Sequence, residues 1–211
     1  MKHVIVGAHL RREDVEPAAA ALSAGDLFLS GVPIADDQPL GDRDLLLRVA
    51  QTRAALLERA TFLAIRYGFS VWAEAEAAAK CAAHLARWKR ILQANRGRVE
   101  MTLKVAASSP KPRPDRHDFA SGSDYLRALH ASAAHVDDDF RAEVERLVAP
   151  VRGKWVPRDN ASLEYAALVD RADVERVTRA GEELKRLFPR VPFLLSGPWP
   201  LEVFGEDDDH E

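Results

Sequence analysis

The clearest pattern in the chain is the alternation of hydrophobic and polar residues over 98–106. Val99, Met101, Leu103 and Val105 alternate there with charged or polar residues. Successive side chains of a β-strand point to opposite faces, so this period predicts a strand with one buried face. A similar alternation covers 163–169, and short apolar runs predict strands near 4–6, 26–32, 151–156 and 191–196.

Apolar residues spaced by three and four positions predict the helices. Leu45, Leu46, Val49, Leu56 and Leu57 form such a stripe, which predicts a helix over 42–60. The same reasoning predicts helices over 13–22, 71–94 and 124–136, one opened by Asp137-Asp138-Asp139 and one after Asp170. The apolar run over 61–65 fits either an extension of the preceding helix or a strand.

The order of these elements predicts two domains in an α+β protein. From residue 98 the order is strand, helix pair, strand, strand, helix, strand, which is the order of a ferredoxin-like fold with an expanded helical crossover. We therefore expect an N-terminal α+β domain over 1–96 and a ferredoxin-like C-terminal domain over 97–204. Residues 205–211 form an acidic tail that we expect to be disordered, and 108–123 a proline-rich, exposed loop.

The C-terminal apolar run stops abruptly at Gly197-Pro198-Trp199-Pro200. The two prolines fix φ and remove two backbone donors, so the strand cannot continue there as a central ladder strand. We expect a buried terminal strand that holds Trp199 half-buried in a stiff, extended segment. Such a ring either packs at a sheet edge or docks a partner, because aromatic residues concentrate in interface cores.

Composition narrows the class of protein. The chain has 211 residues, 47% of them hydrophobic and 30% charged, and a net charge of -3. This charge gives no basic footprint for nucleic acid. An N-terminus without a signal sequence and the absence of a long apolar run predict a soluble, cytoplasmic protein that does not enter a membrane. The one cysteine, Cys81, is expected to be a small buried side chain.

Motifs that carry chemistry are missing from the sequence. The seven histidines lack the spacing of a metal site, no Cys-x-x-Cys pair occurs, and the two Asp triplets lack the spacing of a calcium loop. No glycine-rich phosphate loop and no Gly-x-Ser-x-Gly elbow is found. We predict no metal, no cofactor and no catalytic residue. An enzyme whose site is assembled from distant residues remains an alternative.

Five stretches, in order, resemble the GvpL/GvpF family of gas vesicle accessory proteins. The most specific is Gly197-Pro198-Trp199-Pro200, which resembles the family's Gly-Pro-Trp-Pro signature. Leu63-Ala64-Ile65-Arg66-Tyr67-Gly68, residues 97–105, residues 123–126 and residues 165–169 resemble other family segments. Ala64 stands where the family usually has proline, and Leu201 to Phe204 replace its usual Pro-Tyr-Ser-Phe.

The resemblance implies a non-enzymatic accessory or structural protein of gas vesicle assembly in the cytoplasm. Its implied partners are the hydrophobic shell protein and other gas vesicle accessory proteins, with no nucleic acid, membrane or small-molecule substrate. The alternative function is a ligand-sensing regulatory protein with a ferredoxin-like domain. The candidate structural or partner-binding residues are Arg66, Tyr67, Gly68, Gly197, Pro198, Trp199, Pro200 and Phe204.

Overall fold

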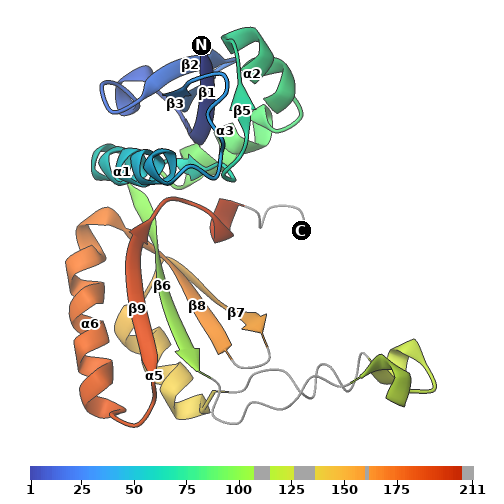
Figure 1. Ribbon diagram of the computed structural model, residues 1–211. Coiled ribbons are helices and arrows are strands. Elements are labelled where there is room, and N and C mark those ends of the chain that lie inside the picture. The colour runs from blue at the N-terminus through green and yellow to red at the C-terminus, as the bar shows by residue number, and fades with distance from the viewer. Residues whose placement is uncertain (107–114, 126–135, 160–161, 206–211) are drawn as a thin grey trace. The chain divides into compact units, whose positions relative to one another are not determined.

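A computed structural model describes residues 1–106, 115–125, 136–159 and 162–205 of the chain (Figure 1). The chain forms two compact units. The first contains Met1–Val99 together with the chain from Trp199 onward, and the second contains Glu100–Pro198. Each unit mixes helices with one β-sheet, as the sequence predicts.

The sheet of the first unit is built around the strand β1. Its order is β2-β3-β1-β4, and the short β5 also pairs with β1, which runs antiparallel to β3, β4 and β5. The predicted strands near 4–6 and 26–32 are confirmed, and the run over 61–65 contains a strand. The bounds are β1 (Lys2–His9), β2 (Ala20–Ala24), β3 (Leu27–Ile34), β4 (Leu63–Ala64) and β5 (Ser70–Val71).

Helix α1 (Arg43–Arg59) confirms the helix predicted over 42–60. Asp42 caps it, because its carboxylate accepts a hydrogen bond from the backbone N–H of Leu45 at 2.9 Å. Leu45, Val49 and Leu56 pack on the face of the sheet that carries Val4 and Val6. Leu46, which the stripe places inside, is 44% exposed.

The helix predicted over 13–22 is wrong. One turn of 3-10 helix (Arg12–Asp14) is followed by a turn and then by β2, which pairs with β3 from Ala20 onward. Pro17 has no N–H to continue a helix, and the residue before a proline avoids the helical region. The alanines after it are good helix formers, but pairing with β3 overrides this local preference.

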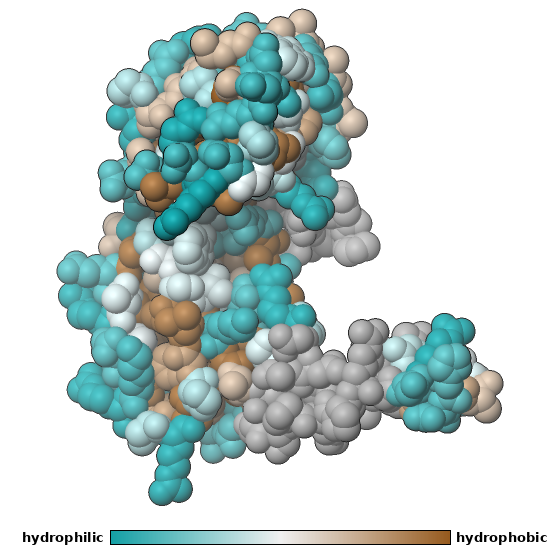
Figure 2. Space-filling view, in the orientation of Figure 1, coloured by the Kyte–Doolittle hydropathy of each residue, from teal (hydrophilic) through white to brown (hydrophobic). Residues whose placement is uncertain are grey.

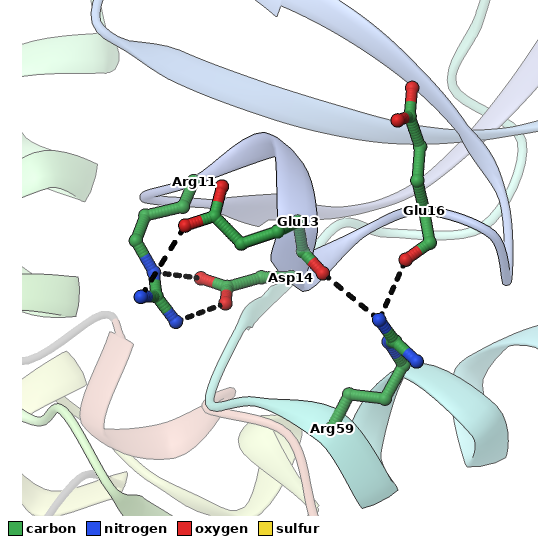
Figure 3. A network of polar contacts seen from close by, with 5 residues as sticks. All are labelled: Arg11, Glu13, Asp14, Glu16 and Arg59. Carbon is green, nitrogen blue, oxygen red and sulfur yellow. Dashed lines mark hydrogen bonds and ion pairs between the residues drawn. The ribbon is translucent and has the colours of Figure 1, made fainter.

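Arginine side chains hold this turn in place (Figure 3). Arg59 of α1 donates from Nη2 to the carbonyl oxygens of Glu13 at 3.1 Å and Glu16 at 2.7 Å. Arg11 forms an ion pair with Asp14 at 2.7 Å. These carbonyl oxygens therefore bond to a side chain of another element, which the sequence pattern does not reveal.

Two helices replace the single helix predicted over 71–94. They are α2 (Glu74–Cys81) and α3 (Leu85–Ala94). Val71 is not helical, because it pairs with His3 of β1 in the short strand β5. The predicted end is confirmed, since the C-cap of α3 is Asn95.

The buried face of α2 also differs from the expected one. In a single helix over 71–94, the spacing of apolar residues from Val71 to Leu92 would bury Ala75 and Ala82. These two are exposed, whereas Ala77 and Cys81 are buried. A stripe drawn through one continuous helix keeps a single phase of 3.6 residues per turn. The chain breaks between α2 and α3 after Cys81, so the two helices do not share one phase. A stripe that fits α3 therefore marks the wrong face of α2.

The second unit has a four-stranded sheet of order β7-β8-β6-β9. Its helices α5 and α6 pack against each other on one side of the sheet (Figure 1). The strands are β6 (Arg98–Ala106), β7 (Arg152–Asp159), β8 (Ser162–Asp170) and β9 (Phe193–Trp199), and the helices are α5 (Asp138–Val148) and α6 (Val174–Leu187). Further 3-10 turns are Arg116–Asp118, Arg171–Asp173 and Val203–Gly205.

Most predictions for the second unit are confirmed. The four apolar residues of β6 are buried, and Asp137 caps α5 through the backbone N–H of Asp139 at 2.9 Å. The position of Glu100 differs from the prediction. The alternation places its side chain on the solvent-exposed face of the strand, but the residue is only 2% exposed. Pro157 lies in β7, an edge strand that tolerates proline.

Some predictions fall outside the described residues. They are most of the helix over 124–136, the first part of the loop over 108–123 and the acidic tail beyond Gly205. Within the described part, residues 122–125 are helical.

Candidate partner-binding site

Trp199 ends β9, at the edge of the sheet of the second unit. β9 pairs only with β6 in the strand order, which confirms that it is not a central ladder strand. The strand is not buried as expected, since Leu194 is 65% exposed, whereas Trp199 is half-buried as expected, with 47% of its surface exposed. Figure 2 shows hydrophobic side chains at the surface of this unit around β9. An exposed, apolar edge strand is a template for binding another protein.

Gly197 allows β9 to approach β6 closely. Its φ is +120°, a conformation that side chains rarely adopt. A Cβ atom at this position would lie 2.8 Å from Met101 Sδ and 3.0 Å from the carbonyl oxygen of Glu100. The glycine of the Gly-Pro-Trp-Pro stretch is therefore required by the fold, and it sets the position from which Trp199 projects.

Beyond Trp199 the chain is anchored in the first unit. The backbone N–H of Leu201 donates to the carbonyl oxygen of Phe62, and the N–H of Ala64 donates to the carbonyl oxygen of Leu201, both at 3.0 Å. Pro200 is buried, and Phe204 is 3% exposed. These two candidates are thus packing residues and are not available to a partner.

Arg66, Tyr67 and Gly68 form a bulge between β4 and β5. Ile65 on one side and Phe69 on the other keep backbone hydrogen bonds to β1, at 3.2 and 2.9 Å. The hydroxyl of Tyr67 donates to the carbonyl oxygen of Leu40, and Gly68 has a φ of +101° with open space around it. The bulge leaves Arg66 exposed.

The structure brings this bulge and the C-terminal stretch to one cavity of about 690 Å³. All residues that line it belong to the first unit, and they include Arg66, Tyr67 and Glu202. Gly197 and Pro198 belong to the second unit and do not line it. The sequence analysis missed Arg53 and Arg87. Arg53 stands four residues after Val49 on the apolar stripe of α1, and this charged interruption is the signal that could have identified it.

His9, the last residue of β1, is a fully buried histidine. Its ring stacks on Phe62 with centroids 5.1 Å apart, and its Nε2 lies 3.0 Å from Ser30 Oγ. The Ser30 hydroxyl donates to the carbonyl oxygen of Gly7, so its oxygen accepts from Nε2–H of His9. Burial lowers the pKa of His9 to about 4, against a smaller opposing effect of the Asp14 carboxylate.

We expect acid to destabilise the chain through His9. The unfolded state, with a pKa of 6.5, takes up a proton that the folded state, with a pKa of about 4, does not. The free energy of unfolding that His9 contributes above pH 6.5 is therefore lost as the pH falls towards 4. The loss is about 1.4 kcal/mol per pH unit, or about 3 kcal/mol in total. Urea unfolding at several pH values measures this slope.

His9→Gln provides the control. Glutamine does not titrate, and its amide N–H can donate to Ser30. The difference in unfolding free energy between the wild type and this variant should shrink as the pH falls from 7 to 4. A difference that does not depend on pH would contradict the role given to His9.

Other residues that could be reactive or bind a metal are explained by the structure. Cys81 is buried, and burial raises the pKa of its thiol, which keeps it protonated. No group of three or more His, Cys, Asp or Glu side chains within residues 1–106, 115–125, 136–159 and 162–205 could hold a metal ion. In the same part of the chain, none of the helices is long and apolar enough to cross a membrane.

Comparison with known proteins identifies relatives of the chain. The sequence model of the family described as gas vesicle synthesis protein GvpL/GvpF matches residues 18–201. No curated protein sequence matches the chain significantly. The matched range contains all five stretches that resemble the family in the sequence.

Two solved structures have a similar fold. The gas vesicle protein GvpF from Microcystis aeruginosa is 9% identical and superposes with a TM-score of 0.70 over 97% of this chain and 99% of that chain. The gas vesicle protein GvpF from Anabaena sp. PCC7120 is 12% identical, with a TM-score of 0.63 over 97% of this chain and 98% of that chain. At such low identity the likeness shows the fold alone.

Proposed function

Since the chain belongs to the GvpL/GvpF family of gas vesicle synthesis proteins, which have an accessory role in gas vesicles, we propose that it binds the hydrophobic shell protein during assembly. Other gas vesicle accessory proteins are its further partners, and it acts in the cytoplasm without catalysing a reaction. The family membership supports the accessory role, and the surface around Trp199 supports the choice of a hydrophobic partner.

We also propose that the two units are domains and that the second is ferredoxin-like. The element order from β6 to β9 and the sheet order β7-β8-β6-β9 support this assignment. The proposed ranges are 1–96 and 97–204, followed by the acidic tail over 205–211. The two compact units have slightly different bounds, because the second covers Glu100–Pro198 and the chain from Trp199 onward belongs to the first.

The single observation that carries the function is the exposure of Trp199 on a constrained edge strand. Pro198 and Pro200 restrict the backbone on both sides, so little conformational entropy is lost when a partner covers the ring. Tryptophan is among the residues enriched at interface hot spots. A shell protein with an apolar surface is a partner that gains from covering this ring.

Trp199→Ala should weaken binding to the shell protein while leaving the fold intact. We expect a loss of about 2 kcal/mol or more in binding, which is about thirtyfold in Kd. The ring is 47% exposed, so the loss in unfolding free energy should stay below about 2 kcal/mol, well under that of a buried aromatic. A pull-down titration with the purified shell protein measures the first quantity and urea unfolding the second.

Trp72→Ala is the matched control, because Trp72 is 49% exposed but lies outside β9. It should leave binding to the shell protein unchanged. Equal loss of binding in both variants would speak against the β9 surface. If the wild-type protein does not bind the shell protein but gains thermal stability from a small ligand, this result would favour the ligand-sensing alternative.

A further inference from the structure

The cavity in the first unit is lined by residues from several elements that are far apart in sequence. Arg53 comes from α1, Arg66 and Tyr67 from the bulge, Lys80 from α2 and Arg87 from α3. Its volume of about 690 Å³ is in the range of sites that bind small molecules or peptide side chains. No role is assigned to this cavity by the family match or by the solved structures.

Positive charge dominates the wall of the cavity. Among the described residues that line it, four are arginine or lysine, and Glu202 is the one acidic residue. The whole chain carries a net charge of -3, so this excess of positive charge is local. A concave site lined by one sign of charge focuses the field and attracts ligands of the opposite sign.

Two of the cations are held in place by their surroundings. Arg53 donates from Nη2 to the carbonyl oxygen of Ile65 at 2.5 Å. Its Nε is buried and has no hydrogen-bond partner in the described part of the chain. Lys80 forms an ion pair with Glu76 at 2.8 Å and lies 5.8 Å from the ring centroid of Phe69. An unpaired buried donor is costly.

Aromatic side chains supply the apolar part of the wall. Tyr67, Phe69 and Trp88 line the cavity, and Trp88 stacks on His84 with ring centroids 5.5 Å apart. Arginine and aromatic residues together are typical of protein interfaces. The wall thus offers contacts to carboxylates and also to the apolar side chains next to them.

We propose that this cavity binds an acidic peptide segment of a partner protein, with aspartate or glutamate carboxylates at the cations and a neighbouring apolar side chain against the aromatic wall. The cations come from four separate segments of the chain, which suits several carboxylates along a peptide better than one compact anion. The proposal rests on the proposed function in one respect, since the partner is a protein of the same assembly.

The test uses a fluorescein-labelled probe peptide, Glu-Asp-Leu-Phe-Asp-Glu-Leu, and its neutral counterpart with Gln and Asn in place of the acids. Fluorescence anisotropy with the full chain should give an affinity at least about tenfold higher for the acidic peptide, and this difference should fall as salt is raised. Equal affinity for the two peptides would overturn the proposal. So would full competition by benzoate at the affinity of the peptide, because the site would then serve a small carboxylate.

Variants of opposite sign separate charge recognition from loss of folding. Arg66→Ala should weaken binding of the acidic peptide by about tenfold, as for a charge contact at an interface, and Glu202→Gln should strengthen it severalfold. Arg186→Ala removes an exposed arginine of α6 in the second unit and should change nothing. A loss in Arg186→Ala equal to that in Arg66→Ala would refute the site.

The same proteins distinguish this proposal from the proposed function. Binding to the shell protein is measured in parallel for the wild type and for Arg66→Ala. A wild type that binds the acidic peptide but not the shell protein leaves the cavity assignment standing and rejects the proposed function. A wild type that binds the shell protein but not the acidic peptide does the reverse.

Discussion

Gly197→Ala is expected to destabilise the second unit by about 3 kcal/mol or more. The backbone conformation at φ +120° is nearly restricted to glycine and costs another residue about 1–3 kcal/mol. The new Cβ would also lie 2.8 Å from Met101 Sδ and 3.0 Å from the carbonyl oxygen of Glu100, and overpacking of this kind adds about 1–3 kcal/mol. Urea unfolding followed by circular dichroism measures the loss.

Gly68→Ala separates the two causes of this loss. Gly68 also has a positive φ, of +101°, but a Cβ there would meet no atom within 4 Å. Its loss should reflect backbone strain alone and stay near about 1–2 kcal/mol. If the two variants lose the same free energy, the close contact between β9 and β6 does not explain the glycine at 197.

Phe62→Ala should cost about 3–5 kcal/mol, the range for truncating a buried aromatic ring. Phe62 is 0% exposed and belongs to the core that contains Leu45 and Leu56 of α1. Its ring also covers one face of His9. Thermal and urea unfolding of the full chain measure the loss.

A second readout follows from the contact with His9. Removing the ring of Phe62 lets water reach the imidazole, so the folded pKa of His9 should rise towards its ordinary value and the acid sensitivity of folding should decrease. Phe62→Leu is the control, because it keeps most of the apolar volume and should cost less. A loss below about 1 kcal/mol for Phe62→Ala would contradict the assigned packing.

The backbone of Phe62 also connects the core of the first unit to the C-terminal stretch. Its carbonyl oxygen accepts from Leu201, two residues after Trp199. The Leu63–Gly68 segment and the C-terminal stretch are therefore parts of one structural arrangement.

Local patterns determined the elements whose burial follows one period without interruption. The alternation over 98–106 predicted β6, and the stripe with Asp42 at its start predicted α1 with its cap. Both predictions rest on the spacing of apolar residues along one short stretch, because the period of a strand or of a helix with one apolar face can be read from the sequence itself. The turn chemistry around Pro198 likewise predicted an edge position for β9.

Tertiary structure decided the elements whose partners are distant in sequence. The alanines after Pro17 became β2 because β3 offered a strand to pair with, and 71–94 became a strand and two helices because β1 pairs with Val71. The turn before β2 depends on Arg59, more than forty residues away.

The sequence by itself determined the family, the mixed α+β class and the special role of the Gly-Pro-Trp-Pro stretch. Only the tertiary structure decided which of the candidate residues are exposed: it buried Pro200 and Phe204, exposed Arg66 and Trp199, and gathered Arg53, Lys80 and Arg87 around a cavity. The physical reason is that hydrophobic periods and turn residues act locally. Convergence of charges from separate helices depends on how the chain packs, which no local pattern encodes.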